Sequence, residues 1–264
     1  MKIKLTGFFC IFFLILMSVN GMAGDQDSTC CESKKGCMAV ADSLSDAWNH
    51  EEAASKYKKI LEEHPDKYEA LWKAARELTE WANFLPEDEK ELKEPLFLEA
   101  TDMARKATKV NPEGWEGYYR LSVALGRLAL FRGGKEKINL SKAVKAAADS
   151  SIMINPDEAG PYHVLGRWHQ NLANLSWFLR AAARVIYGGA PPGSNEEALA
   201  LFQKCIELEP NKIRHHLELA RTDKYLGEKD KMKEPLETVL ALPESEEEDP
   251  GFKEEAKEML KKLK

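Results

Sequence analysis

Apolar side chains recur at three- and four-residue spacing from about Cys37 onward, and the breaks between these runs carry Pro or Gly. This spacing places the apolar residues on one face of an α-helix. The strict alternation that is typical of half-buried strands is rare. The pattern therefore predicts an all-α chain built from amphipathic helices.

Five of the predicted helices end in a similar way, with an apolar tail that is followed by a proline. Because proline cannot continue a helix, each one marks a helix end and the entry to the next unit. These prolines are Pro65, Pro112, Pro156, Pro210 and Pro243. They are 47, 44, 54 and 33 residues apart. The chain is therefore predicted to consist of repeated helical units of unequal length.

The order of large and small residues within a unit is most regular in the fourth unit. Its first helix carries Leu165-Gly166, and its second helix carries Ala198, Phe202 and Cys205 before the proline. This order resembles the tetratricopeptide repeat family, whose period is about 34 residues. The second helices of the third and fifth units match it poorly. The resemblance implies paired helices that approach closely at the small residues, in repeats that must stack to bury their apolar faces.

We therefore expect a tetratricopeptide-like solenoid of helical hairpins, with about five repeats over residues 37–243. Residues 244–264 would add an acidic spacer and a C-terminal capping helix. The charges of the spacer, Glu244 to Asp249, are expected to be solvated. Residues 166–187 run on without a break before the next turn, which predicts an unusually long first helix in the fourth unit.

A more specific set of motifs lies between residues 160 and 243. It consists of Gly166-Arg167-Trp168, Leu175-Ser176-Trp177, Tyr187, Pro191-Pro192, Glu196-Glu197-Ala198-Leu199 and Phe202. These motifs resemble the regulator of microtubule dynamics family, and the likeness extends more weakly over residues 40–264. The resemblance implies a repeat protein without enzymatic activity, with a role at microtubules or organelle contacts, or in lipid binding. We expect the motif residues to be mostly structural, with Trp168, Trp177 and Phe178 in the core.

The N-terminus has a different composition. Lys2 and Lys4 precede an apolar run from Phe8 to Val19, and small residues follow at Gly21 and Ala23. This is the layout of a secretory signal, and the run is shorter than the roughly 20 residues that span a membrane. Residues 1–23 therefore predict a signal peptide and an exported protein, periplasmic or secreted. The alternative is an uncleaved N-terminal anchor.

Three cysteines, Cys30, Cys31 and Cys37, lie in or next to a polar segment at residues 24–36. In an oxidising compartment they would form a small disulfide loop, Cys37 with Cys30 or with Cys31, or stay as thiols. A metal site would need more ligands, and the nearest histidine, His50, is 13 residues away. No metal and no cofactor are therefore predicted. Cys205 lies on an apolar helix face and is expected to be buried.

Composition narrows the function classes further. The formal net charge is −6, which disfavours generic binding to nucleic acid. The histidines show no zinc-protease spacing, and the Gly-Gly pairs lack the lysine of a phosphate loop. An enzyme is therefore not expected.

The first helix of each tetratricopeptide repeat lines a concave groove, and its inward positions are known from that family. Applied to this chain, the inward residues are Trp72, Arg76, Tyr119, His163, Arg167, Gln170, Arg214, Arg221 and Lys224. Residues 159–195 and 117–135 contain no Asp or Glu but several arginines. Guanidinium groups suit carboxylates and phosphates, so the groove is predicted to bind a protein or peptide with acidic or C-terminal carboxylate groups. Two alternatives remain open: an anionic lipid in the groove, or arginines that only pack and pair with acids of the neighbouring repeat.

Overall fold

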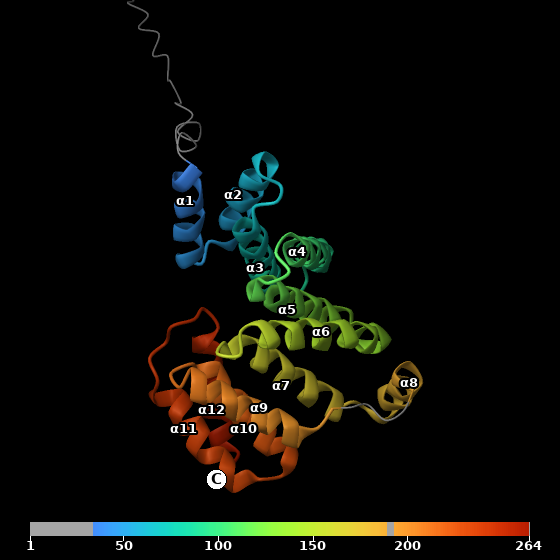
Figure 1. The fold of residues 1–264 in the computed structure, drawn as a ribbon. Coiled ribbons are helices and arrows are strands. Elements are labelled where there is room, and N and C mark those ends of the chain that lie inside the picture. Colours follow the sequence, from blue (N-terminus) through green and yellow to red (C-terminus); the bar gives the residue numbers. More distant parts are fainter. Residues whose placement is uncertain (1–33, 189–192, 264) are drawn as a thin grey trace, which may run out of the picture.

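The computed structural model describes residues 34–188 and 193–263, and these residues form helices without any strand. In Figure 1 the helices are stacked from α1 at the top to the group α9–α12 at the bottom. The first six are α1 (Lys34–Asp46), α2 (His50–Glu63), α3 (Tyr68–Phe84), α4 (Lys90–Val110), α5 (Trp115–Arg132) and α6 (Gly134–Ile154). The others are α7 (Ala159–Ala173), α8 (Trp177–Tyr187), α9 (Asn195–Leu208), α10 (Ile213–Leu226), the short 3-10 helix η2 (Lys229–Met232), α11 (Lys233–Ala241) and α12 (Asp249–Lys261).

The described helices pair into five hairpins: α1 with α2, α3 with α4, α5 with α6, α7 with α9, and α10 with α11. The second helix of each hairpin packs against the first helix of the next. The first helices α3, α5, α7 and α10 also pack against one another in sequence, so they form a continuous inner layer. Helix α12 packs on α10 and α11 and closes the stack. The predicted solenoid of five repeats with a capping helix is confirmed.

The helix ends follow the prolines closely. Helices α2, α4, α6, α9 and α11 each end two residues before one of the five prolines identified in the sequence. Their last turns therefore never have to accommodate a residue that lacks an amide hydrogen. This confirms the predicted boundaries between the repeats.

Small residues do lie where the paired helices approach most closely. A Cβ atom added at Gly166 on α7 would come within 2.6 Å of the ring of Phe202 on α9. Phe202 is fully buried, and so is Cys205, whose thiol donates a hydrogen bond to the carbonyl oxygen of Ala159 at 3.4 Å. The fourth hairpin is thus held together by the residues that the repeat pattern selected.

The prediction of one long helix over residues 166–187 is wrong. Helix α7 ends at Ala173, and α8 begins at Trp177 in a new direction. Ser176 is the N-cap of α8, because its side chain accepts a hydrogen bond from the backbone N–H of Leu179. Leu175, between the two helices, is buried. A capping serine and a buried leucine therefore break a segment whose apolar spacing is continuous.

The prediction that Trp168, Trp177 and Phe178 lie in the core is correct for Trp168 and wrong for the other two. Trp168 is buried, and its indole N–H donates to the carbonyl oxygen of Ser141 at 2.7 Å. Trp177 is 82% exposed and Phe178 is 57% exposed. Both lie on α8, which packs on the solenoid through its opposite face.

Several sequence features lie outside the described residues. These include the predicted signal peptide at residues 1–23, and also Cys30, Cys31, Pro191 and Pro192. The predicted disulfide with Cys37 therefore has no structural description. No helix within residues 34–188 or 193–263 has the length and apolarity needed to cross a membrane.

Candidate partner-binding groove

The inner helices α3, α5, α7 and α10, together with α12, enclose a central cavity of about 240 Å³. Its lining combines five arginines with three carboxylates. The arginines are Arg120, Arg127, Arg167, Arg214 and Arg221, and the carboxylates are Glu80, Glu218 and Glu248. The cavity is therefore strongly charged, but it carries both signs.

The structure brings five of the predicted groove residues to this central cavity: Tyr119, His163, Arg167, Arg214 and Arg221. Gln170 lies in an adjoining pocket with Arg167 and Arg221, and Lys224 lies in a further pocket beside α12. Trp72 lies next to the cavity, because the guanidinium groups of Arg76 and Arg120 are 5.7 and 6.0 Å from its ring centre. All nine residues thus belong to one side of the solenoid, although they do not line a single pocket.

The three arginines at equivalent repeat positions do not form a continuous basic stripe. Arg76 lies 2.5 Å from Glu77, measured from Nε to the carboxylate. Arg167 and Arg221 both pair with Glu218, and Arg221 also pairs with a second carboxylate, on α12. Glu218 is almost completely buried between them. Arg167 therefore joins α7 to α10 of the next repeat, and Arg221 joins α10 to the capping helix α12, whereas Arg76 pairs within its own helix. Pairing with an acid of the neighbouring repeat, the alternative left open by the sequence, thus applies to Arg167.

The acidic spacer between α11 and α12 is only partly solvated, whereas the prediction was that its charges are solvated. It turns back toward α5 (Figure 1, red loop) and places three consecutive glutamates against α2, α3, α5 and the start of α10. Glu246 pairs with Lys212 at 3.0 Å and with Arg214 at 3.4 Å. Glu247 lies 2.9 Å from His50. Glu248 accepts a hydrogen bond from Asn83 at 3.0 Å and pairs with Arg127 at 3.2 Å. The sequence could not show this because the basic partners are distant along the chain. The chain's own acidic segment therefore occupies part of the groove.

Asp249, the first residue of α12, holds this segment in shape. Its side chain is fully buried and accepts hydrogen bonds from the backbone N–H groups of Ser245 at 2.7 Å and Glu246 at 2.8 Å. A carboxylate that bonds to two consecutive amides stabilises a tight turn. The three glutamates are thereby presented to the groove from a fixed turn.

His50 joins the acidic segment to the inner layer. Its Nδ1 lies 2.7 Å from Glu77 on α3, and its Nε2 lies 2.9 Å from Glu247. Burial on its own lowers the pKa of His50, but the hydrogen bonds to Glu77 and Glu247 outweigh it and raise the pKa above the ordinary value. The protonated ring can donate to both carboxylates at once, so His50 acts as a charged bridge between them.

Arg120 is the groove residue that the inward-position rule missed, although the acid-free run at residues 117–135 contains it. Its guanidinium group lies 4.5 Å from the ring centre of Tyr119 and close to Trp72. Its Nε atom is buried without a hydrogen-bond partner, and no carboxylate of the described residues lies within 4.0 Å of the group. Burial lowers the pKa of Arg120, and burial also raises the pKa of Glu80 in the same cavity. Arg120 is thus a partly buried cation that no anion of the described chain neutralises directly.

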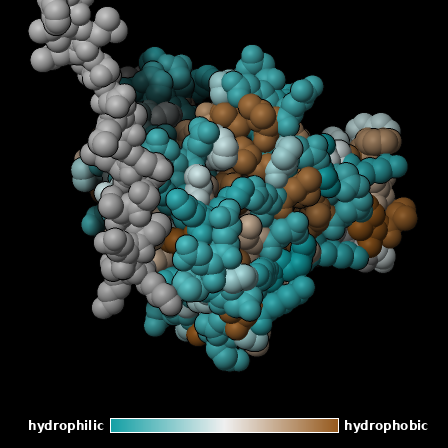
Figure 2. Space-filling model, turned by 90° about the horizontal axis from the view of Figure 1, so that it is seen from above, coloured by the Kyte–Doolittle hydropathy of each residue, from teal (hydrophilic) through white to brown (hydrophobic). Residues whose placement is uncertain are grey.

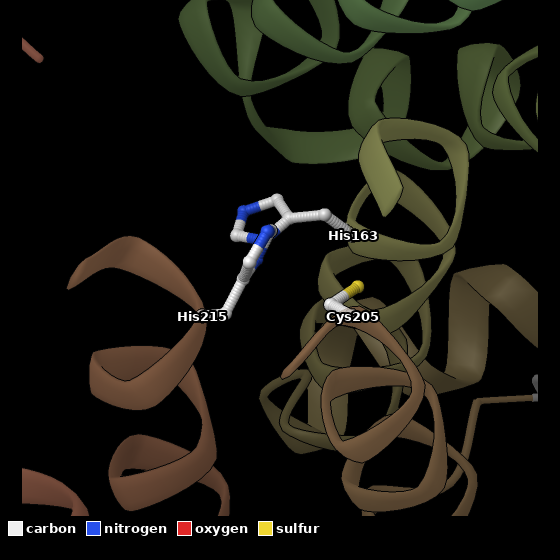
Figure 3. Close-up of side chains that lie close together, drawn as sticks. All are labelled: His163, Cys205 and His215. Carbon is white, nitrogen blue, oxygen red and sulfur yellow. The ribbon is translucent and has the colours of Figure 1, made fainter. Parts of the chain in front are cut away.

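A third group of side chains, His163, Cys205 and His215, lies at the edge of the cavity (Figure 3). The Nδ1 atoms of the two histidines are 3.0 Å apart, and Nε2 of His215 lies 3.1 Å from Glu209. Their potential ligand atoms and the cysteine sulfur all lie within 4.8 Å of one another. Burial and then the charge of Arg214 keep the pKa of His163 well below its ordinary value.

Burial raises the pKa of the Cys205 thiol to about 12, so in the metal-free site this group is the neutral thiol. The positive charge of Arg214 opposes a bound cation. The described geometry instead forms a chain of hydrogen bonds from His163 through His215 to Glu209. We therefore assign the group to packing between α7 and α10.

Comparison with known proteins gives one family. The family model described as "Regulator of microtubule dynamics protein 1-3" matches residues 37–264. Regulator of microtubule dynamics protein 1 of Mus musculus is 28% identical over 193 residues, which is 73% of this chain and 63% of the mouse protein. The protein of the same name from Caenorhabditis elegans is 24% identical over 225 residues, 85% of this chain and 98% of the worm protein.

Among solved structures, a thermophilic TPR protein of Thermus thermophilus, TTC0263, superposes with a TM-score of 0.63 at 16% identity. The match covers 86% of this chain and 99% of that one, and it shows the fold alone. The chain spans 63% of the mouse relative and 45% of the Bos taurus relative.

These matches overturn the predicted periplasmic or secreted location. The relatives are animal proteins named for regulating microtubule dynamics, and microtubules lie inside the cell. The prediction was wrong because it rested only on the composition of residues 1–23: two lysines, a short apolar run and the small residues Gly21 and Ala23. Such a composition does not by itself identify an export signal.

Proposed function

This chain belongs to the regulator of microtubule dynamics protein 1-3 family, and from that premise we propose that it is a non-catalytic repeat scaffold. Its inner groove binds an acidic, carboxylate-bearing segment of a partner protein. The observation that carries the proposal is the position of the chain's own acidic segment, whose glutamates pair with Lys212, Arg127 and His50. A groove that accommodates three glutamates of its own chain has the charge and shape to accept those of another.

Arg120 and Arg214 are the groups that we propose contact the partner. Both have a buried Nε atom without a hydrogen-bond partner, and both line the central cavity. Arg120 has no carboxylate beside it, whereas Arg214 pairs with Glu246 at 3.4 Å, the glutamate that a partner carboxylate would have to replace. Hydrogen bonds to a charged group contribute about 1.5–3 kcal/mol. A carboxylate that entered the cavity would therefore gain strong donors, while Tyr119 and Trp72 would provide apolar contact area beside it.

The charge of the cavity favours a carboxylate-bearing segment. The central cavity has about 240 Å³ and is lined by five arginines. A side-chain or terminal carboxylate fits this volume and would find guanidinium donors on several sides. The names of the relatives make microtubule proteins the first source of such a segment to test.

The test is a titration of fluorescently labelled peptides, one rich in glutamate and one with the same sequence carrying glutamine, by anisotropy. We expect the acidic peptide to bind and the neutral peptide to bind much more weakly. Arg120→Gln should weaken binding of the acidic peptide by about 10- to 150-fold, which corresponds to the loss of a charged hydrogen bond. The same variant should reduce co-sedimentation with microtubules if these carry the partner segment.

Arg105→Gln is the matched control, because Arg105 lies on α4, outside the cavity, and pairs only with Asp102 among the described residues. It should bind the acidic peptide as the natural chain does. Equal affinity of the natural chain for both peptides, or an unchanged affinity of the Arg120 variant, would refute the proposal.

A further inference from the structure

Helix α8 carries a cluster of large apolar side chains that no part of the described chain covers. Trp177 is 82% exposed, Phe178 57% and Val185 84%. In Figure 1 the helix stands apart from the stacked hairpins, and Figure 2 shows hydrophobic surface at the edge of the molecule on the same side. Large exposed apolar residues that are grouped in this way are typical of an interaction surface.

The exposed cluster is presented by a helix that is held firmly from behind. Leu179, Ala182, Ala183 and Ile186 pack into the core cluster that also contains Trp168. At about 100° per residue, the exposed residues Trp177, Ala181, Val185 and Phe178 fall within an arc of about 100° on the other side. The apolar face is therefore a fixed feature of the fold.

The charges of α8 are all positive. Arg180 and Arg184 adjoin the apolar arc one turn apart, and the chain has no Asp or Glu from residue 159 to residue 195. The Nη2 group of Arg180 donates to the carbonyl oxygens of Ala173 and Leu175 at the end of α7. Arg184 is exposed on α8. This basic helix contrasts with the net charge of −6 of the whole chain.

We propose that α8 docks the protein on an anionic bilayer surface, with Trp177, Phe178 and Val185 inserted at the level of the headgroups and Arg184 against the lipid phosphates. An amphipathic helix with aromatic and basic residues binds in the plane of the interface. The 11 residues of α8 are too few to span the hydrocarbon core, which needs about 20. The apolar arc of α8 suits the apolar interior of a bilayer, and the arginines that border the arc suit its negatively charged headgroups.

The test uses the full-length chain and vesicles of phosphatidylcholine, with or without 30% phosphatidylserine (roughly the anionic content of a charged leaflet). Binding should require phosphatidylserine. A triple variant, Trp177→Ser, Phe178→Ser and Val185→Ser, should bind at least about tenfold more weakly, and Arg184→Gln should bind about fivefold more weakly at low salt. A brominated lipid should quench tryptophan fluorescence of the natural chain more than that of Trp177→Phe, which retains an apolar ring.

The control triple variant, Leu92→Ser, Leu98→Ser and Met153→Ser, removes exposed apolar residues from other helices and should bind as the natural chain does. The N-terminal apolar run could itself bind vesicles, but every variant retains it. A difference in vesicle binding between the variants therefore comes from α8. The proposal is wrong if the α8 triple variant still binds fully, if Trp177 is not quenched, or if binding ignores phosphatidylserine. A self-association in solution that the α8 triple variant abolishes, without vesicle binding, would identify a protein-docking face instead.

Discussion

The arginines of the groove have two different roles. Those beside a carboxylate form ion pairs within the fold, and one without a carboxylate neighbour is available to a ligand. Arg167 and Arg221 share the buried carboxylate of Glu218, so their charge is used within the fold. Arg120 lies against Tyr119 and Trp72 without a direct carboxylate partner in the described chain. A buried ion pair offers little to a ligand, because the ligand would first have to break it. Arg120 is therefore the residue at which substitution should separate partner binding from folding.

Gly166 should be intolerant of even one added methyl group. Its missing side chain leaves room for the ring of Phe202, and a Cβ atom would approach that ring to 2.6 Å. Gly166→Ala should lower the free energy of unfolding by about 1–3 kcal/mol through overpacking. Gly126→Ala is the control, because nothing lies within 4 Å of the added atom in the middle of α5. Urea unfolding should show that this second change stabilises by about 0.5–1 kcal/mol.

His50 should make stability depend on pH above about pH 6.5. Burial alone would lower the pKa of His50. The hydrogen bonds to Glu77 and Glu247 and the charge of Glu80 outweigh burial, so the pKa of His50 is raised above its ordinary value. A histidine whose folded pKa is raised stabilises fully below the unfolded value of about 6.5 and loses that contribution as the pH rises through the folded pKa. Unfolding free energy should therefore fall as the pH increases in this window, and His50→Gln should remove the slope.

The other histidines whose pKa is shifted do not affect stability in the pH range above about 6.5. Burial lowers the pKa values of His163, His169 and His215, so their effects on stability appear on the acid side. A slope above pH 6.5 that persists in His50→Gln would show that a different group is responsible.

At the scale of elements, the acidic segment between α11 and α12 acts as a built-in competitor of the proposed partner. Exchanging Glu246, Glu247 and Glu248 for glutamine removes the ion pairs that hold it, each of which contributes about 0.2–1 kcal/mol at partly exposed positions. The affinity for the acidic peptide should therefore rise about 5- to 30-fold. A control triple variant with the same charge change, Glu62→Gln, Glu63→Gln and Glu91→Gln, alters exposed acids outside the groove and should leave the affinity unchanged.

The break between α7 and α8 results from a local interaction, the capping of α8 by Ser176. Apolar spacing runs on through residues 166–187, and periodicity alone therefore extends the helix. Ser176 supplies the cap that starts a new helix, and serine is among the residues preferred at that position. This signal was present in the sequence but is weaker than the periodicity around it. As a consequence Trp177 and Phe178, which would be internal on a continuous helix, face outward.

At the scale of the whole molecule, the acidic segment closes the solenoid. Repeats normally contact only their neighbours, but Glu247 reaches His50 on α2 and Glu248 reaches Asn83 on α3. The first and last hairpins are therefore linked across the groove. Small-angle scattering of the variant with Glu246, Glu247 and Glu248 changed to glutamine should show a larger radius of gyration. Unchanged dimensions would mean that packing between adjacent repeats sets the curvature alone.

The sequence by itself determined the stack of helical hairpins. Its evidence is local: apolar spacing within each helix, a proline two residues beyond the second helix of each hairpin, and small residues such as Gly166 at the closest seams. The inner-face positions of Arg167 and Arg221 followed from the same register.

Tertiary structure alone decided how the groove is charged. Arg127 and Arg167 find their acidic partners on distant elements, and the acidic segment meets residues as far as 197 positions away. No periodicity carries such information, because which charges meet depends on how the whole stack curves. The packing of α8 on α6 likewise leaves the apolar face of α8 uncovered.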